Sequence, residues 1–372
     1  MRIALVHDWF NEAGGAEKVL KEMIHCFPDA DVFCLFDFFD DAKRDKYLAG
    51  KTTKRSFIQH IPFAKKYYRF MFPLFPLAIE QLDLSPYDLI ISSSYCVAKG
   101  IKKQKWQVHV CYCHSPVRYA WDLRDDYLEA VRFSLSRNVF SFFLTRLRKW
   151  DKASSIRVDY FIANSENVSK RIQSNYDRTS VVIYPPVEVG TFCIQEKKSD
   201  YYFTASRLVS YKKKELLLKA FGQLPHLHFQ VAGDGPTRKK LEKIAPPNVE
   251  MLGYIAKNTL IEKIKAAKAF VAAANEDFGI TIVEAQACGT PVIVPYLGGY
   301  KETVLPTTGL FFKEQTVEDI VNAITQFEQE KKYYRPMDFI DNVSRFNQAR
   351  FHHELIQYVS RKYSDYKNAQ KI

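Results

Sequence analysis

The sequence predicts an α/β protein built from two doubly wound domains, each with a parallel sheet covered by helices on both faces. Short apolar runs alternate with helical patterns along the chain, and a stretch rich in proline and charge at residues 183–200 separates two series of them. The length of 372 residues also favours two domains. We expect domains at 1–190 and 196–345 and a C-terminal helix at 346–372, for which packing back on the N-terminal domain is one option.

Each element is predicted from its apolar pattern. Short runs rich in β-branched and aromatic residues indicate buried parallel strands, and the helical spacing between them indicates covering helices. In the N-terminal half the expected strands are Ile3–Val6, Val32–Phe36, Leu89–Ser92, Val108–Tyr112 and Tyr160–Ala163, and the helices include Ala16–Cys26, Ala130–Ser154 and Glu166–Ser174. In the C-terminal half the strands are Tyr201–Ala205, Leu227–Val231, Val249–Leu252, Ala269–Ala273 and Pro291–Val294, and the helices are Lys214–Phe221, Arg238–Ile244, Asn258–Ala267 and Ile280–Ala287.

The composition indicates an anionic partner and a reducing compartment. The net charge of +12 suits nucleotide phosphates, lipid headgroups or nucleic acid, and charge alone does not distinguish them. The seven cysteines are scattered and form no CxxC pair, which is typical of a reducing compartment. The first residues show no secretory signal and no apolar run is long enough to span a bilayer, so we expect a cytoplasmic protein.

A glycine-rich turn, VAGDGP, follows an expected strand of the C-terminal half and precedes a helix. Gly233, Asp234 and Gly235 therefore lie at the carboxyl end of a strand, where open α/β sheets bind ligands. A plain turn explains the two glycines equally well.

Two cations follow the strand Tyr201–Ala205 in the stretch SRLVSYKKK. A loop at this place can direct Arg207 and Lys212 to one diphosphate, the arginine by its planar fork and the lysine as a point charge. The alternative is a solvated charge run, and because Lys213 and Lys214 follow directly, the choice of lysine is open by a residue.

A pair of glutamates, Glu276 and Glu284, lies in NEDFGITIVEAQACGTPVIV with seven residues between the two. Phe278, Gly279 and Ile280 mark the start of a helix, whose free backbone N–H groups favour an anion. Glu284 then suits the hydroxyls of a ribose and Glu276 those of a transferred sugar. The alternative is an acid that only favours the helix dipole.

In this order, SRL-x2-YK, V-x-GDGP and E-x7-E resemble the retaining glycosyltransferases of family 4 over nearly the whole chain. The resemblance implies the GT-B fold, with two Rossmann-like domains facing a deep interdomain cleft. The run HSPVRYAWD, residues 114–122, is similar to that of O-antigen mannosyltransferases of this family.

The resemblance also assigns roles in the N-terminal half. It places Gly14 and Gly15 against the donor phosphates and His114 beside the transferred sugar, although a turn glycine and a structural histidine are the alternatives. Residues implied for the acceptor or sugar pocket are Arg118, Tyr119, Trp121, Asp122, Asn164 and Ser165, of which Ser165 also suits a helix N-cap.

The implied function is the transfer of a sugar, mannose from GDP-mannose, to a lipid-linked polysaccharide or O-antigen-type acceptor, with His114, Glu276, Arg207 and Lys212 at the reacting centre. UDP-sugars are the alternative donors. We expect no cofactor and no metal, because no histidine or cysteine pair has zinc-site spacing. An epimerase or hydrolase of the same fold would need a pair of catalytic acids, which the sequence does not show. A nucleic-acid binding protein would need a recognisable binding module, which is also missing from the sequence. A glycan-binding protein without catalysis is the last alternative.

Two basic and aromatic segments suit an anionic membrane surface, which would place the protein at the inner face of the cytoplasmic membrane. Lys51–Phe75 has six Lys or Arg and no acid, and Arg132–Lys149 mixes arginines with phenylalanines, among them Arg132 and Phe133. Half-buried helices with a solvated basic edge are the alternative. Nothing in the sequence indicates the oligomeric state.

Overall fold

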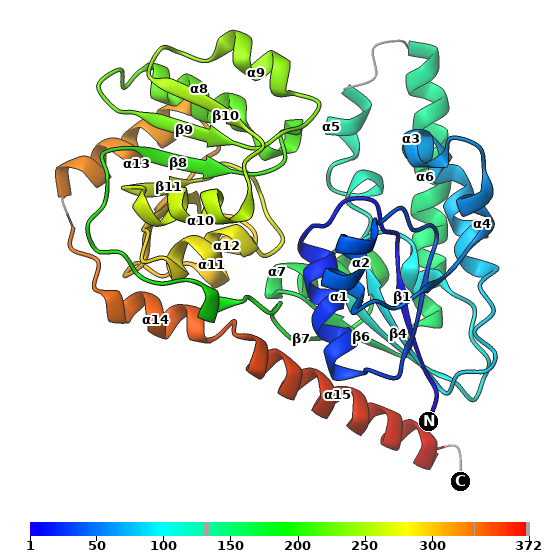
Figure 1. The fold of residues 1–372 in the computed structure, drawn as a ribbon. Helices are drawn as coiled ribbons and strands as arrows, with labels where there is room; N and C mark the ends of the chain where they lie inside the picture. The colour runs from blue at the N-terminus through cyan, green and yellow to red at the C-terminus, as the bar shows by residue number, and fades with distance from the viewer. Residues whose placement is uncertain (130–133, 331, 370–372) are drawn as a thin grey trace. The chain divides into compact units, whose positions relative to one another are not determined.

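A computed structural model describes residues 1–129, 134–330 and 332–369 (Figure 1). The chain forms two compact units, Met1–Pro186 together with the segment that begins at Ala349, and Val187–Gln348. The final helix α15 (Gln348–Ala369) therefore belongs to the first unit, apart from its first residue. Ala130, where the sequence places the start of a helix, and Arg132 and Phe133 of the second basic segment lie outside the described residues.

In the described part of the first unit, seven strands form one parallel sheet in the order β3-β2-β1-β4-β5-β6-β7. The direction of winding reverses between β1 and β4, which pair from Ile3 with Leu89 to His7 with Ser93. This is the topological switch point at which such sheets bind ligands. The strands are β1 (Ile3–His7), β2 (Asp31–Cys34), β3 (Thr53–Arg55), β4 (Leu89–Ser94), β5 (Val108–Cys113), β6 (Tyr160–Ala163) and β7 (Ser180–Val182).

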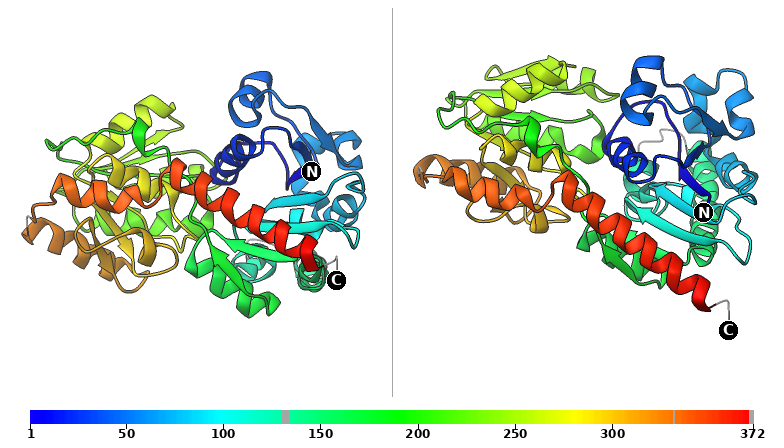
Figure 2. Two further views of the ribbon diagram at one scale, coloured as in Figure 1. Left: turned by 90° about the horizontal axis from the view of Figure 1, so that it is seen from below. Right: turned by 60° about the horizontal axis from the view of Figure 1, so that its bottom comes forward.

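Helices pack on both faces of this sheet, because alternate residues of each strand point to opposite faces. Leu5 belongs to a core with α1 and α15, whereas its neighbours Ala4 and Val6 belong to a core that includes α4 and α6. Figure 2 shows α15 running along the first unit as a single long helix. The helices are α1 (Gly15–Cys26), α2 (Asp41–Leu48), α3 (Ala64–Tyr67), α4 (Phe75–Glu80), α5 (Arg124–Glu129), α6 (Ser134–Ser154) and α7 (Glu166–Tyr176), besides α15.

Among the described residues of the second unit, six parallel strands follow the order β10-β9-β8-β11-β12-β13. Its switch point lies between β8 and β11. The strands are β8 (Tyr202–Ala205), β9 (Phe229–Ala232), β10 (Val249–Gly253), β11 (Ala269–Val271), β12 (Val292–Pro295) and β13 (Gly309–Phe312). The helices are α8 (Lys214–Gly222), α9 (Arg238–Ile244), α10 (Lys257–Ala266), α11 (Ile280–Ala287), α12 (Tyr300–Thr303), α13 (Val317–Glu330) and α14 (Pro336–Ser344).

The predicted α/β class with two doubly wound units is confirmed. The sequence missed β3 and β7, because outer strands of three residues are too short to show an apolar pattern and depend on pairing with a neighbour. It also missed β13 and the helices α12 to α14. Within the described residues, none of the helices combines the length and the apolar character needed to cross a bilayer.

Candidate functional site

The predicted residues of the second unit gather at one edge of its sheet. Arg207 and Lys212 follow β8, Gly233 follows β9, and Glu276 follows β11. Because these three strands are parallel neighbours, their carboxyl ends meet at the same edge, around the switch point.

An ion pair between Lys212 and Glu276 forms the centre of this edge, although the two residues are 64 positions apart. Their side chains are only 17% and 20% exposed, so water screens the pair incompletely. The structure also separates the three lysines. Lys213 has left-handed backbone (φ 52°) and caps α8, whereas Lys214 is buried and donates to the Thr204 hydroxyl at 2.5 Å. Burial, and then the charge of Lys212, lower the pKa of Lys214 to about 7, so Lys214 is only partly protonated near pH 7.

Glycine is required at two positions of the VAGDGP turn, because the backbone there lies close to the backbone of the loop after β8. A Cβ on Gly233 would overlap the carbonyl oxygen of Ser206, and one on Gly235 would overlap that of Leu208. The backbone at Gly233 also has φ +130°, which disfavours other residues. Asp234 turns back and accepts the N–H of Gly235 at 2.7 Å, so in this structure its carboxylate supports the turn.

The loop that carries Glu276 is held by a second glycine pair that the sequence analysis missed. The N–H of Gly299 donates to the carbonyl of Glu276 at 2.9 Å, and a Cβ on Gly298 would overlap the same carbonyl. Gly279 caps α11 at φ 87°, and a Cβ there would lie 2.8 Å from the Tyr300 ring. The signal in the sequence is the Gly-Gly pair that comes two residues after an apolar strand.

The other residues predicted to bind the sugar donor differ in which of their groups a ligand can reach. The ring of Phe278 is buried against Phe346, with ring centroids 5.3 Å apart, so its backbone rather than its ring remains for a ligand. Ile280 opens α11 and Glu284 lies about one turn further along it, partly exposed. Arg207 is exposed, and among the described residues its guanidinium makes no ion pair.

A chain of buried polar groups lies at the switch point of the first unit. His114, directly after β5, contacts the Ser93 hydroxyl through Nε2 at 2.8 Å, and the same hydroxyl contacts His7 Nδ1 at 3.1 Å. His7 Nε2 reaches Glu17 Oε1 at 3.3 Å. The other oxygen of Glu17 accepts the N–H of Gly14 at 2.7 Å, so this N–H is already bonded. Sequence reasoning found His114 and Gly14 but missed their three partners, because each comes from a different segment.

These contacts fix the protons of the chain when both imidazoles are neutral. The Glu17 carboxylate only accepts, so His7 carries its proton on Nε2 and accepts from Ser93 at Nδ1. The Ser93 oxygen then accepts from His114 Nε2, which leaves His114 Nδ1 as an acceptor. Burial, and then His7, lower the pKa of His114 to about 3, so a neutral ring is expected near pH 7.

Two residues of the HSPVRYAWD run point their polar atoms into the protein rather than into a pocket. The Tyr119 hydroxyl is 2.8 Å from the Cys96 sulfur, and the indole N–H of Trp121 donates to Asp151 at 2.8 Å. Both rings pack against a core of the first unit. The structure therefore gives Tyr119 and Trp121 structural contacts, whatever their role toward an acceptor.

The remaining residues of the predicted acceptor pocket lie nearer the surface or cap a helix. Arg118 donates to Asp122 at 3.0 Å, and Arg171 of α7 reaches the same carboxylate at 3.3 Å. Ser165 is buried and caps α7 through its hydroxyl, as the sequence predicted, and Asn164 is buried beside it after β6. His114 and Asn164 thus occupy neighbouring strand ends.

Two family profiles match the chain, Glycosyltransferase Family 4 over residues 13–190 and Glycosyl transferases group 1 over residues 194–344. Together they take in the switch point of the second unit and, except for β1, the sheet of the first unit. The chain belongs to the family 4 glycosyltransferases.

Solved structures of similar fold agree with a family 4 chain of GT-B architecture. Sucrose-phosphate synthase from Thermosynechococcus elongatus superposes with a TM-score of 0.75 and 17% identity, over 98% of this chain and 100% of that one. HepE from Anabaena, in complex with UDP, gives 0.67 and 17%, over 97% and 100%. At these identities the similarity supports the fold alone.

Curated relatives match the family 4 chain over shorter stretches. A GDP-mannose-dependent monoacylated alpha-(1-6)-phosphatidylinositol monomannoside mannosyltransferase from Corynebacterium glutamicum is 35% identical over 136 residues, which is 32% of this chain and 36% of that protein. A D-inositol 3-phosphate glycosyltransferase from Mycolicibacterium smegmatis is 25% identical over 236 residues, 56% of this chain and 54% of that protein. The chain thus spans about a third to a half of the length of these relatives.

Proposed function

We propose that this chain is a retaining glycosyltransferase that moves a sugar from a nucleotide sugar to a lipid-linked polysaccharide or O-antigen-type acceptor. The observation that carries the proposal is the Lys212–Glu276 ion pair at the β8–β11 switch point. It sets a cation for phosphate beside a carboxylate for sugar hydroxyls, and a nucleotide sugar presents both chemistries side by side.

The cations of the second unit then stabilise the leaving group. Negative charge develops on the departing diphosphate, and Lys212, Arg207 and the start of α11 can meet it with positive charge and backbone N–H groups. No carboxylate is assigned as a covalent nucleophile. The acceptor hydroxyl attacks from the side of the leaving group, and the departing phosphate helps to accept its proton. In the first unit, Nδ1 of a neutral His114 accepts a hydrogen bond from a sugar hydroxyl.

For the donor we propose GDP-mannose. The HSPVRYAWD run resembles that of mannosyltransferases, and one partial relative is named as a GDP-mannose-dependent mannosyltransferase. A UDP-sugar is the competing donor, because HepE, whose fold is similar, was solved in complex with UDP.

Calorimetric and thermal-shift titrations with GDP, UDP, ADP and their sugars, in EDTA, test the proposal. We expect one site per chain and tightest binding of GDP and GDP-mannose. Preference for UDP would replace the donor but keep the transferase. Absence of binding to every nucleotide contradicts the proposed function as a whole.

We further propose that the first unit docks on an anionic bilayer at the inner face of the cytoplasmic membrane. Phe63 and Phe70, around α3, are 76% and 80% exposed, and Tyr67 and Leu74 nearby are also exposed, so apolar side chains are grouped at this place. Lys65, Lys66 and Arg69 lie between them in the sequence. Apolar side chains that enter the interface and cations that meet lipid phosphates are the two parts of such a surface.

Helix α6 extends this surface. Phe72 contacts Phe140 and Phe143 of α6, with ring centroids 5.5 and 6.2 Å apart, so the two segments lie together. On the same helix, Leu135 and Phe142 are exposed. Docking through this surface would thus bring the enzyme to the bilayer that holds a lipid-linked acceptor.

Cosedimentation with vesicles of anionic and of neutral lipid tests the docking surface. Reversal of Lys65, Lys66 and Arg69 to Glu should abolish binding to anionic vesicles. The matched control reverses Lys239, Lys240 and Lys243 on α9 of the second unit and should leave binding nearly unchanged. Equal loss in both variants would indicate net charge rather than a docking surface, and undiminished binding in the first variant would reject it.

A further inference from the structure

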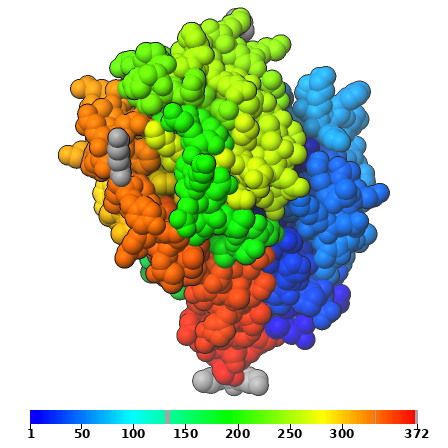
Figure 3. Space-filling model, turned by 60° about the vertical axis from the view of Figure 1, so that its left-hand side comes forward, coloured from blue at the N-terminus to red at the C-terminus, as the bar shows by residue number. Residues whose placement is uncertain are grey.

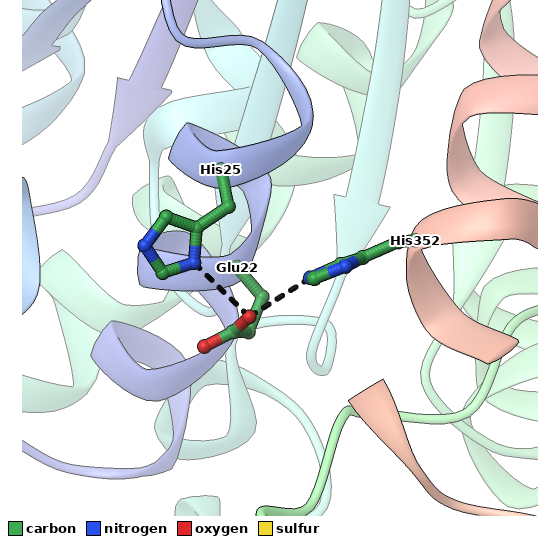
Figure 4. A group of neighbouring side chains, drawn as sticks. All are labelled: Glu22, His25 and His352. Atoms are coloured by element: carbon green, nitrogen blue, oxygen red, sulfur yellow. Dashed lines mark hydrogen bonds and ion pairs between the residues drawn. The ribbon is translucent and has the colours of Figure 1, made fainter. Parts of the chain in front are cut away.

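A cluster of two histidines and a glutamate on the first unit lies apart from both switch points. Glu22 and His25 lie one turn apart on α1, and His352 comes from α15, 330 residues further along the chain than Glu22. Figure 4 shows both imidazoles directed at the Glu22 carboxylate. His352 Nε2 is 2.8 Å and His25 Nδ1 3.2 Å from the same oxygen, Oε2.

From this geometry we propose that Glu22, His25 and His352 bind one divalent transition-metal ion of the zinc class, which joins α15 to α1. Their ligand atoms all lie within 4.8 Å of one another. Tetrahedral zinc with bonds of about 2.0–2.1 Å needs ligand atoms about 3.4 Å apart, so small side-chain rotations suffice. Two imidazole nitrogens and one carboxylate oxygen form a known zinc donor set that leaves a fourth position for water.

The protein already holds these ligands in place. Val19, Leu20 and Met23 of α1 share a core with Phe351 and Leu355 of α15, so the two helices are fixed before any ion arrives. Figure 3 shows the surface of the C-terminal helix directly beside that of the N-terminal segment. The Glu22 side chain is 4% exposed, whereas the His25 and His352 side chains are 48% and 33% exposed, so an ion can enter from solvent.

Binding exchanges the present hydrogen bonds for metal bonds. Each imidazole moves its proton to the other ring nitrogen or releases it, and the carboxylate exchanges two N–H partners for the cation. The Lys21 ammonium, 3.5 Å from Glu22 Oε1, competes electrostatically and favours a site of moderate rather than very high affinity. A metal here closes the chain between its first and last helices and stabilises the docking of α15.

Titration with Zn²⁺, and with Co²⁺ monitored by visible absorption, tests the site on tag-free, EDTA-treated full-length protein after desalting. We expect one ion per chain, visible d–d bands for Co²⁺, and a rise in the thermal midpoint with Zn²⁺. His352→Gln and His25→Asn should each weaken binding at least tenfold and remove the thermal effect. His353→Gln, on the exposed neighbouring residue, is the control and should bind as the parent does.

Circular dichroism without metal shows whether each variant is folded, so that a folding defect is not taken for a lost ligand. Absence of Zn²⁺ binding by the parent protein overturns the proposal, as does equal affinity of the parent, H25N and H352Q. Because nucleotide binding is measured in EDTA, neither result depends on the proposed transferase function.

Discussion

The Lys212–Glu276 pair gives the sharpest test of the second unit's site. Lys212→Met removes the cation and keeps most of the apolar stem. Although the two side chains are only 17% and 20% exposed, they still reach solvent at the sheet edge, so the ion pair itself contributes about 1 kcal/mol to folding. A charge-assisted contact to phosphate is worth about 1.5–3 kcal/mol. Nucleoside diphosphate should therefore bind about 10- to 150-fold more weakly, while stability changes little.

Isothermal titration calorimetry with the preferred nucleoside diphosphate measures this difference. Part of the loss in Lys212→Met comes from the Glu276 carboxylate, which then faces the phosphate without its partner. The double variant with Glu276→Gln should thus recover part of the affinity. Lys213→Met is the matched control, because this neighbour caps α8 and does not pair with Glu276. Unchanged affinity in Lys212→Met, or an equal loss in Lys213→Met, would refute the diphosphate assignment.

Four further outcomes are expected. Arg207→Ala should lower kcat by about 10²–10³ with the preferred donor, as for loss of one stabilising donor at a developing anion, and steady-state kinetics at full rate would contradict this role. Glu284→Ala should raise the Kd of the nucleotide about tenfold through lost ribose contacts but leave the 2′,3′-dideoxy nucleotide unaffected, and an equal change for both ligands would remove that role. Gly233→Ala should lower the thermal midpoint by several degrees, because its Cβ overlaps a backbone carbonyl, and an unchanged melting curve would show that the loop gives way. His109 and His114 are buried, with pKa values lowered to about 3, so the unfolded chain binds more protons than the folded chain between pH 6.5 and 3. As the pH is lowered through this window, the free energy of unfolding should decrease by up to about 1.4 kcal/mol per pH unit for each histidine. Equal free energies of unfolding from denaturant titrations at pH 7 and pH 5 would contradict this.

The centre of the second site could be predicted from the sequence because its residues directly follow recognisable strands. Arg207 and Glu276 come after apolar runs, and parallel strands bring their carboxyl ends to one edge. The sequence favoured Lys212 but left the choice open by a residue, since it depends on the left-handed backbone at Lys213 and the burial of Lys214.

Contacts between distant segments were the main features that the sequence did not reveal. Ser93 links His7 to His114 only because β1, β4 and β5 are neighbours in the sheet, and the order of strands is not written in any local pattern. The HSPVRYAWD run indicated a pocket, yet the inward direction of Trp121 is set by Asp151 on a helix that follows later in the chain.

Analysis of the transferred product tests the central proposal most directly. The protein is incubated with GDP-mannose labelled at the anomeric carbon and with the lipid-linked glycan fraction of a membrane extract, and the product is examined by nuclear magnetic resonance. We expect the label to move to the lipid fraction with its α configuration retained, and the Lys212→Met variant to transfer far less. A β-linked product would contradict the retaining mechanism. Release of the nucleotide without any transfer, from every donor that binds, would contradict the transferase itself.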